Sequence, residues 1–227
     1  METEGQFKPA SAISPEERKQ EWMRYYSYKR IHEQLMQVQM LKGLSINTVL
    51  EIGPYYGLVT AMLDNAGYEV TTMDLSPRSF ERPDRPHVVM DLTAIEAGKL
   101  NGFDCIMCCA TLEHITFEQA TAALRAFRAA SPRYVVISVP YQGTQLFFQT
   151  YLNRHKASEH FAIKKLRFLR EFRFDAEADP YGHKWEIGYR GWSLGRFERV
   201  LRGVGFEILR RDFSYPSYSV FHVLEPV

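Results

Sequence analysis

Glycines and an acid stand at the end of a short apolar segment, where they could hold a small ligand. The segment from Val49 to Gly57 places Glu51 and Gly53 at the end of an apolar run and reaches Gly57 as a helical pattern begins. Glycine has no Cβ, so such a turn lets backbone N–H groups and a helix N-terminus approach a ligand closely. The turn alone is weak support, because tight strand-to-helix connections also need glycine for structural reasons.

Three later segments repeat this arrangement of an apolar run that ends in a polar residue. Val70 to Asp74 and Val88 to Asp91 each end in an acid, and Phe103 to Ile115 leads into Glu113 and His114 just before a helical pattern. A carboxylate at the tip of the second strand of a nucleotide-binding α/β sheet hydrogen-bonds ribose hydroxyls. Asp74 taken alone is equally consistent with a solvated loop residue.

In this order and at these intervals, the four segments resemble the class I S-adenosylmethionine-dependent methyltransferases over roughly residues 47–140. The resemblance implies an α/β, Rossmann-like seven-stranded sheet whose last strand is antiparallel, with S-adenosylmethionine as cofactor. It implies these cofactor-binding residues: Glu51, Gly53, Tyr55, Gly57, Asp74, Leu75, Asp91, Leu92 and Ala110. A nicotinamide-dependent reductase is disfavoured, because the glycine spacing is not the G-x-G-x-x-G fingerprint.

The resemblance also implies a role for each part of this set. Glu51 and Gly53 shape the loop around the methionine moiety, Asp74 binds the ribose, Asp91 and Leu92 flank the adenine, and Ala110 lies along the cofactor.

Tyr55 departs from the family pattern, since it stands where the family loop has its middle glycine. The tyrosine either turns away and leaves the cofactor site open, or projects into the methionine pocket and weakens it. This departure motivates an alternative function, a non-catalytic methyltransferase-fold protein that binds or scaffolds.

Two histidines are the candidate catalytic residues. Methyl transfer to a hydroxyl benefits from a general base, and histidine is suited to that role near neutral pH. His114 ends the fourth segment, and His183 opens His183-Lys-Trp-Glu-Ile-Gly188, a motif similar to the acceptor side of bacterial enzymes that methylate polysaccharides and small molecules. Glu113 and Glu186 could orient the histidines, although all four residues could also be purely structural. We expect O-methylation of a small-molecule or glycan acceptor.

The apolar patterns predict the elements that must position these residues. A helix capped by Ser14 should run to about Lys42, and further helices should cover Leu58 to Gly67, Thr116 to Ala130 and Ser193 to Gly205. Strands are predicted at Thr48–Ile52, Glu69–Met73, Val88–Asp91, Cys105–Cys109, Tyr134–Val139, Glu207–Arg211 and Tyr218–Leu224. The short link between the last two strands predicts an antiparallel pair.

We expect residues 1–43 to form a tail and a lid helix, with Tyr25 or Tyr26 at the methionine end of the cofactor, and residues 44–227 to form the methyltransferase domain. An insertion over about 141–182, rich in bases and aromatic residues, is interpreted as a helical cap. Such a cap could favour an anionic acceptor or rest on an anionic membrane surface, or it could simply expose a charged face.

Composition narrows the classes of protein that fit. The formal net charge is only +1, from 28 Lys and Arg against 27 Asp and Glu, which argues against a nucleic-acid partner. The three cysteines lie in one apolar run, so we expect small buried hydrophobes, no disulfides, no metal site and a cytoplasmic location. No apolar run approaches the length of a membrane span. The sequence makes no prediction of oligomeric state.

Overall fold

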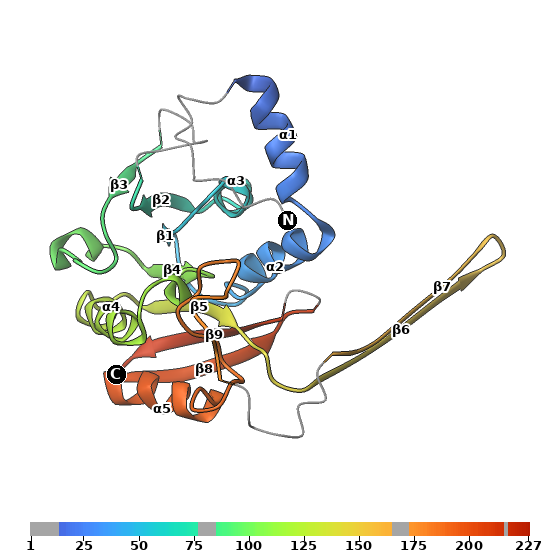
Figure 1. Cartoon of the computed structure of the whole chain (residues 1–227). Coiled ribbons are helices and arrows are strands. Elements are labelled where there is room, and N and C mark those ends of the chain that lie inside the picture. Colours follow the sequence, from blue (N-terminus) through green and yellow to red (C-terminus); the bar gives the residue numbers. More distant parts are fainter. Residues whose placement is uncertain (1–13, 77–84, 165–172, 216–217) are drawn as a thin grey trace.

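The computed structural model describes residues 14–76, 85–164, 173–215 and 218–227 (Figure 1). Its centre is a seven-stranded sheet with the order β3-β2-β1-β4-β5-β9-β8. The strands are β1 Thr48–Ile52, β2 Glu69–Asp74, β3 His87–Val89, β4 Cys105–Cys109, β5 Tyr134–Pro140, β8 Phe206–Phe213 and β9 Ser219–Pro226. The first five are parallel, and β9 is antiparallel to both β5 and β8. The predicted α/β fold with an antiparallel last strand is confirmed.

Both faces of the sheet are buried, because side chains along each strand alternate between two hydrophobic clusters. In β1, Leu50 and Ile52 pack in one cluster with buried residues of α4 (Phe117–Ala129) and α5 (Leu194–Val204). Val49 packs in the other cluster with buried residues of α3 (Leu58–Asn65). The sheet is therefore the middle layer of three, and its strand ends are where polar side chains can meet a ligand.

The cysteines follow the same alternation along β4. Cys108 faces the α4 side, Cys105 and Cys109 face the α3 side, and all three are free and buried. This agrees with their prediction as small hydrophobes.

The N-terminal segment contains two helices instead of the single helix that we predicted. Ser14 caps α1 (Pro15–Tyr25) with the expected capping box, but the chain leaves helical geometry at Tyr26, whose ψ is 79°. Ser27 then adopts an extended conformation, and its side chain accepts a hydrogen bond from the Arg30 backbone N–H to start α2 (Tyr28–Gln39). A serine hydroxyl that can cap a new helix competes with continuation of the old one.

The predicted helical cap is also wrong where the structure describes it. Residues 145–164 form a β-hairpin of β6 (Gln145–Asn153) and β7 (Lys156–Lys164), which extends away from the central sheet (Figure 1). The two-residue link is supported by Asn153 Oδ1, which accepts a hydrogen bond from the His155 backbone N–H at 2.8 Å. The abundant aromatic and β-branched residues of this segment favour strands, and Asn at the turn favours a hairpin.

No helix among the described residues has both the length and the apolar character needed to cross a membrane. The part of the chain that the structure describes also contains two 3₁₀ segments, η2 (Ala97–Leu100) and η3 (Leu112–His114), and η3 is the next element after β4.

Candidate active site

The glycine turn after β1 is shaped by steric constraints that only glycine meets. Gly53 has φ +73°, and a Cβ at this position would lie 2.5 Å from the Thr111 Oγ1 atom. Its backbone N–H donates to the Met73 carbonyl at 2.8 Å, which ties the turn to the end of β2. Gly57 has φ +72° and is the N-cap of α3. The turn therefore keeps the backbone bare beside a helix N-terminus, where an anionic or polar ligand group is favoured.

Tyr55 keeps a backbone conformation that favours glycine, with φ +49°. Its ring packs on Tyr25 at the end of α1 and on Tyr56, with centroid distances of 4.5 and 4.2 Å. Tyr26 also approaches Tyr56 at 6.2 Å, and Tyr55 stays 38% exposed. The aromatic contacts join the N-terminal helices to the glycine turn.

The predicted acids lie at the carboxyl ends of neighbouring strands. Glu51 is buried, with 4% exposure, and Asp74 Oδ1 accepts a hydrogen bond from the Ser76 backbone N–H at 3.0 Å. Asp91 lies just beyond β3, and its Oδ1 accepts hydrogen bonds from the Thr93 backbone N–H and hydroxyl. These donors hold the pKa of Asp91 below its usual value.

The remaining predicted cofactor residues lie along the same edge. Leu75 is exposed beside Asp74, and Leu92 is partly buried against the core. Ala110 follows β4 with φ +50°, and its backbone N–H donates to the Ser138 carbonyl at 3.0 Å. In the order β3-β2-β1-β4, the edge thus presents acids, a bare glycine turn and an exposed alanine. This arrangement fits a nucleoside joined to an amino-acid moiety, as the resemblance implies.

The two predicted catalytic histidines come together at the carboxyl edge of β4 and β5. His114 ends η3, and the loop that carries His183 is held against η3 and the end of β5 by backbone hydrogen bonds. The Lys184 N–H donates to the Glu113 carbonyl at 2.7 Å, and the Ile187 N–H donates to the Pro140 carbonyl at 3.1 Å. The loop is therefore placed by tertiary contacts with residues distant in the sequence.

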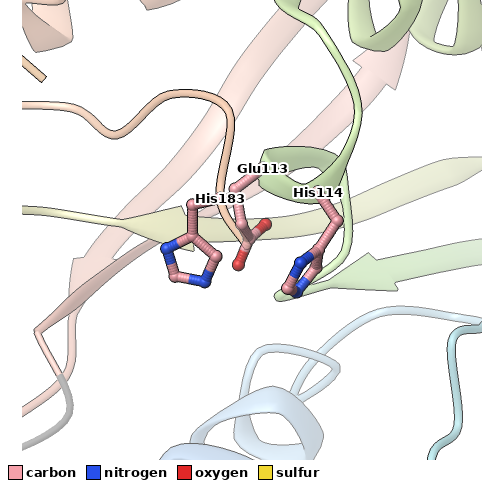
Figure 2. A group of neighbouring side chains, drawn as sticks. All are labelled: Glu113, His114 and His183. Atoms are coloured by element: carbon pink, nitrogen blue, oxygen red, sulfur yellow. The ribbon is translucent and has the colours of Figure 1, made fainter. Parts of the chain in front are cut away.

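The imidazole rings of His114 and His183 meet edge to face, with centroids 4.9 Å apart. Figure 2 shows the Glu113 carboxylate directed between them. His183 Nδ1 is 2.8 Å from Glu186 Oε1, and the His183 backbone N–H donates to Asp179 Oδ2 at 2.9 Å. Glu186 therefore orients the His183 ring, as the sequence suggested.

The protein environment raises the pKa values of Glu113 and His183 and lowers the pKa of His114. Burial raises the pKa of Glu113 to about 8, and burial together with the nearby His183 lowers the pKa of His114 to about 4. For His183 burial favours the neutral ring, but the hydrogen bond that its ring donates to Glu186 and the charges of Glu113 and Asp179 outweigh this effect, so the pKa of His183 is raised.

Two acids of this region were not predicted. Asp179 lies four residues before His183, and Glu33 of α2 shares a hydrogen bond with the Ser219 hydroxyl at the start of β9. Burial raises the pKa of Glu33, which also interacts electrostatically with His183. Asp179 could have been found as an acid near a candidate histidine. Glu33 carries no sequence signal, because only the packing of α2 brings it here.

Comparisons with known proteins place the chain in a family. A family model described as a methyltransferase domain matches residues 20–210. No curated protein matches. Among solved structures, the N-methyltransferase NodS from Bradyrhizobium japonicum WM9, in complex with S-adenosylhomocysteine, is 12% identical with a TM-score of 0.60, covering 90% of this chain and 91% of that chain.

Two further solved structures share the fold. The glycopeptide N-methyltransferase MtfA, in complex with S-adenosylhomocysteine, is 13% identical with a TM-score of 0.60, covering 94% of this chain and 98% of that chain. The magnesium protoporphyrin IX methyltransferase from Synechocystis PCC 6803, with bound S-adenosylmethionine, is 15% identical with a TM-score of 0.55, covering 92% and 91%. With the family match and the strand-end geometry, these findings show that the chain belongs to the methyltransferase domain family as a class I S-adenosylmethionine-dependent methyltransferase.

Proposed function

We propose that this chain transfers the methyl group of S-adenosylmethionine to a hydroxyl of a small-molecule or glycan acceptor bound beside His114 and His183. The observation that carries this proposal is the His183–Glu186 hydrogen bond of 2.8 Å at the carboxyl edge of the sheet. A carboxylate that orients a histidine is the arrangement expected of a group that assists proton removal from a hydroxyl. The three free, buried thiols support a cytoplasmic location.

When bound, S-adenosylmethionine supplies an electrophilic methyl group on a sulfonium. We propose that the residues of the four strand ends, from Glu51 to Ala110, hold this cofactor, with Asp74 on its ribose and Asp91 beside its adenine. The glycine turn brings backbone N–H groups close, and the rings of Tyr25 and Tyr55 cover the turn as a lid. Positioning of two reactants in a water-poor site supplies most of the rate enhancement for such a displacement.

The charges near the histidines favour an acceptor that is neutral or cationic at its reacting end. Four acids lie near the two rings: Asp179 and Glu186, and also Glu33 and Glu113, whose raised pKa values favour the neutral carboxyl form. The anionic acceptor that we expected depends on the basic segment after β6, of which Lys165 and Arg167 lie outside the described residues. Any acidic group of the acceptor would therefore be directed away from His183.

The test is a product assay over a panel of hydroxyl-bearing small molecules and glycans, with S-adenosylhomocysteine as readout. We expect turnover on at least one acceptor, and we expect His183→Gln to lower kcat about 100-fold or more while cofactor affinity by calorimetry stays unchanged. The matched control is His155→Gln, which alters an exposed histidine of the hairpin turn and should keep full activity.

One observation favours a second candidate function. Tyr55 stands at the turn where its ring can fill space beside the cofactor site, as a non-catalytic binding or scaffolding protein could tolerate. Calorimetry that shows cofactor binding, together with no turnover on any acceptor of the panel, would support that alternative.

A further inference from the structure

We infer that Glu113, His114 and His183 form a binding site for one divalent transition-metal cation. Each residue offers one ligand atom, and the three atoms lie within 4.8 Å of one another (Figure 2). Two histidines and one glutamate are a known ligand set of open, catalytic zinc sites, in which a fourth position remains for water or substrate. No metal site was expected from the sequence, in which no cluster of partner ligands is apparent beside the cysteines.

Glu113 provides the first independent sign of a missing cation. The residue is only 1% exposed, and its Oε2 atom is buried without a hydrogen-bond partner among the residues that the structure describes. A buried carboxylate oxygen without a partner is costly, because nothing replaces the water that it loses on folding. In Figure 2 this carboxylate points between the two imidazole rings, so a cation bound by the rings would also complete its coordination.

His183 provides the second sign, because its ring is already prepared as a ligand. Nδ1 faces Glu186 Oε1 at 2.8 Å, which leaves Nε2 as the nitrogen that can bind a cation. Metal-ligating histidines almost always donate their other ring N–H to a carboxylate or carbonyl, and this bond fixes the ring orientation. The backbone hydrogen bond from Lys184 to the Glu113 carbonyl, at 2.7 Å, holds the two ligand segments together.

In a neighbouring set, Asp179, His183 and Glu186, the ligand atoms also lie within 4.8 Å of one another, but this set is a poorer site. Its oxygens are already used within the protein. Asp179 Oδ2 accepts backbone hydrogen bonds from Tyr181 and His183, both at 2.9 Å, and Glu186 bonds to the His183 ring. These two acids therefore hold His183 in place by hydrogen bonds, and Glu113 and His114 complete the cation site on the other side of the ring.

The role of the cation rests on the proposed function, whereas its binding does not. A cation on these three side chains leaves a coordination position at the edge where the acceptor is proposed to bind. A hydroxyl that coordinates a divalent cation would lose its proton to water more readily, and its oxygen could then accept the methyl group while the sulfonium leaves as a thioether. The two histidines would then assist methyl transfer by holding the cation that activates the acceptor.

Cobalt(II) is a suitable probe, since its visible absorption reports coordination by nitrogen and oxygen ligands. The full-length protein, freed of metal by dialysis against a chelator, is titrated with Co²⁺ and followed by absorption and calorimetry. We expect one Co²⁺ per chain and at least tenfold weaker binding in Glu113→Gln, His114→Ala and His183→Ala. Circular dichroism checks the fold of each variant. His114 is exposed, so the His114→Ala substitution leaves no cavity in the hydrophobic core.

Two substitutions serve as matched controls: Glu177→Gln and His155→Ala each remove the same chemical group from an exposed position and should leave Co²⁺ binding unchanged. Absence of stoichiometric binding, or binding that all three site variants retain, overturns the inference. Methyl transfer by metal-free protein that still depends on His183 would overturn the catalytic role of the cation while leaving the proposed function intact. Bound Co²⁺ without turnover on any acceptor would keep the site and refute the proposed function.

Discussion

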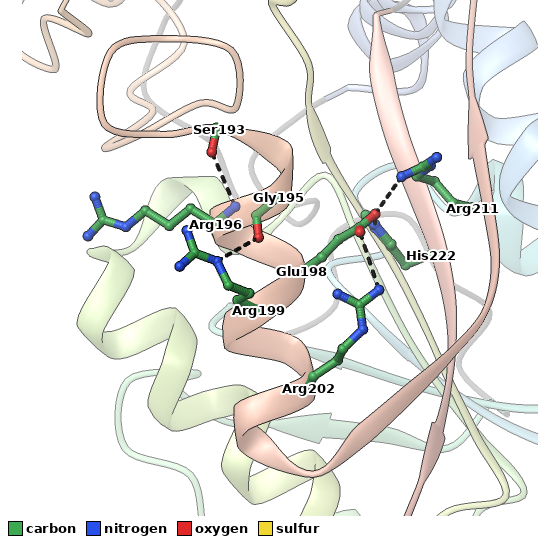
Figure 3. Close-up of polar contacts among 8 residues, drawn as sticks. All are labelled: Ser193, Gly195, Arg196, Glu198, Arg199, Arg202, Arg211 and His222. Atoms are coloured by element: carbon green, nitrogen blue, oxygen red, sulfur yellow. Dashed lines mark hydrogen bonds and ion pairs between the residues drawn. The ribbon is translucent and has the colours of Figure 1, made fainter.

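Acidification from pH 7 to pH 5 should destabilise the fold through His222, a buried histidine outside the proposed active site. His222 lies in β9 between Ile137 of β5 and Arg211 of β8, with 0% exposure. Its Nε2 is 3.3 Å from Glu198 Oε1, and its Nδ1 is buried without a hydrogen-bond partner among the described residues. Glu198 also pairs with Arg211 at 2.9 Å (Figure 3). This pair keeps Glu198 ionised, so its carboxylate can accept a hydrogen bond from the neutral ring of His222.

The size of the effect follows from the pKa of His222 in the folded and unfolded states. Burial lowers the folded value from 6.5 to about 4, although the hydrogen bond and charge of Glu198 partly oppose the shift. Between these two pKa values the unfolded chain binds a proton that the folded protein does not bind. The free energy of unfolding therefore decreases as the pH is lowered. Each pH unit in this range costs about 1.4 kcal/mol, which amounts to about 2 kcal/mol at pH 5 and about 3 kcal/mol near pH 4.

The assay is urea unfolding of the wild type and His222→Gln at pH 7, 6 and 5. Glutamine can still donate a hydrogen bond to Glu198 but does not titrate. Between pH 7 and pH 5 the free energy of unfolding of His222→Gln should therefore decrease by about 2 kcal/mol less than that of the wild type. Other groups contribute to both proteins and cancel in the difference. His155→Gln should follow the wild type, because that imidazole is exposed. A difference between wild type and His222→Gln that does not change with pH would refute the reasoning.

Three further predictions concern the cofactor edge and the core. Gly53→Ala should weaken S-adenosylmethionine binding at least tenfold in calorimetry, because the new Cβ would meet Thr111 Oγ1 at 2.5 Å in a left-handed backbone; unchanged affinity would show that the turn can move. Asp74→Asn should weaken the same binding about tenfold without changing Tm, and equal affinity would remove Asp74 from the ribose site. Phe127→Ala, at a position with 0% exposure, should cost about 3–5 kcal/mol in urea unfolding, and a loss below about 1 kcal/mol would contradict its place in the core.

Most of the central sheet could be predicted because its signals are local. The apolar runs of β1 and β4 and the capping boxes at Ser14 and Thr116 each act within one segment, and the structure has them where they were expected. The two errors arose where local signals compete. Ser27 interrupted a helical stripe, and the aromatic segment from Gln145 to Lys164 was consistent with more than one element until its strands paired.

The sequence by itself determined the fold class and which strand ends carry the acids and glycines, because parallel strands bring their carboxyl ends to one side of the sheet. Only the tertiary structure decided the histidine cluster. His183 reaches His114 because its loop is hydrogen-bonded to η3 and to the end of β5, and Glu33 is brought here by the packing of α2. Such contacts join residues distant in the chain, and they also create the burial that sets the pKa values of Glu113 and His114.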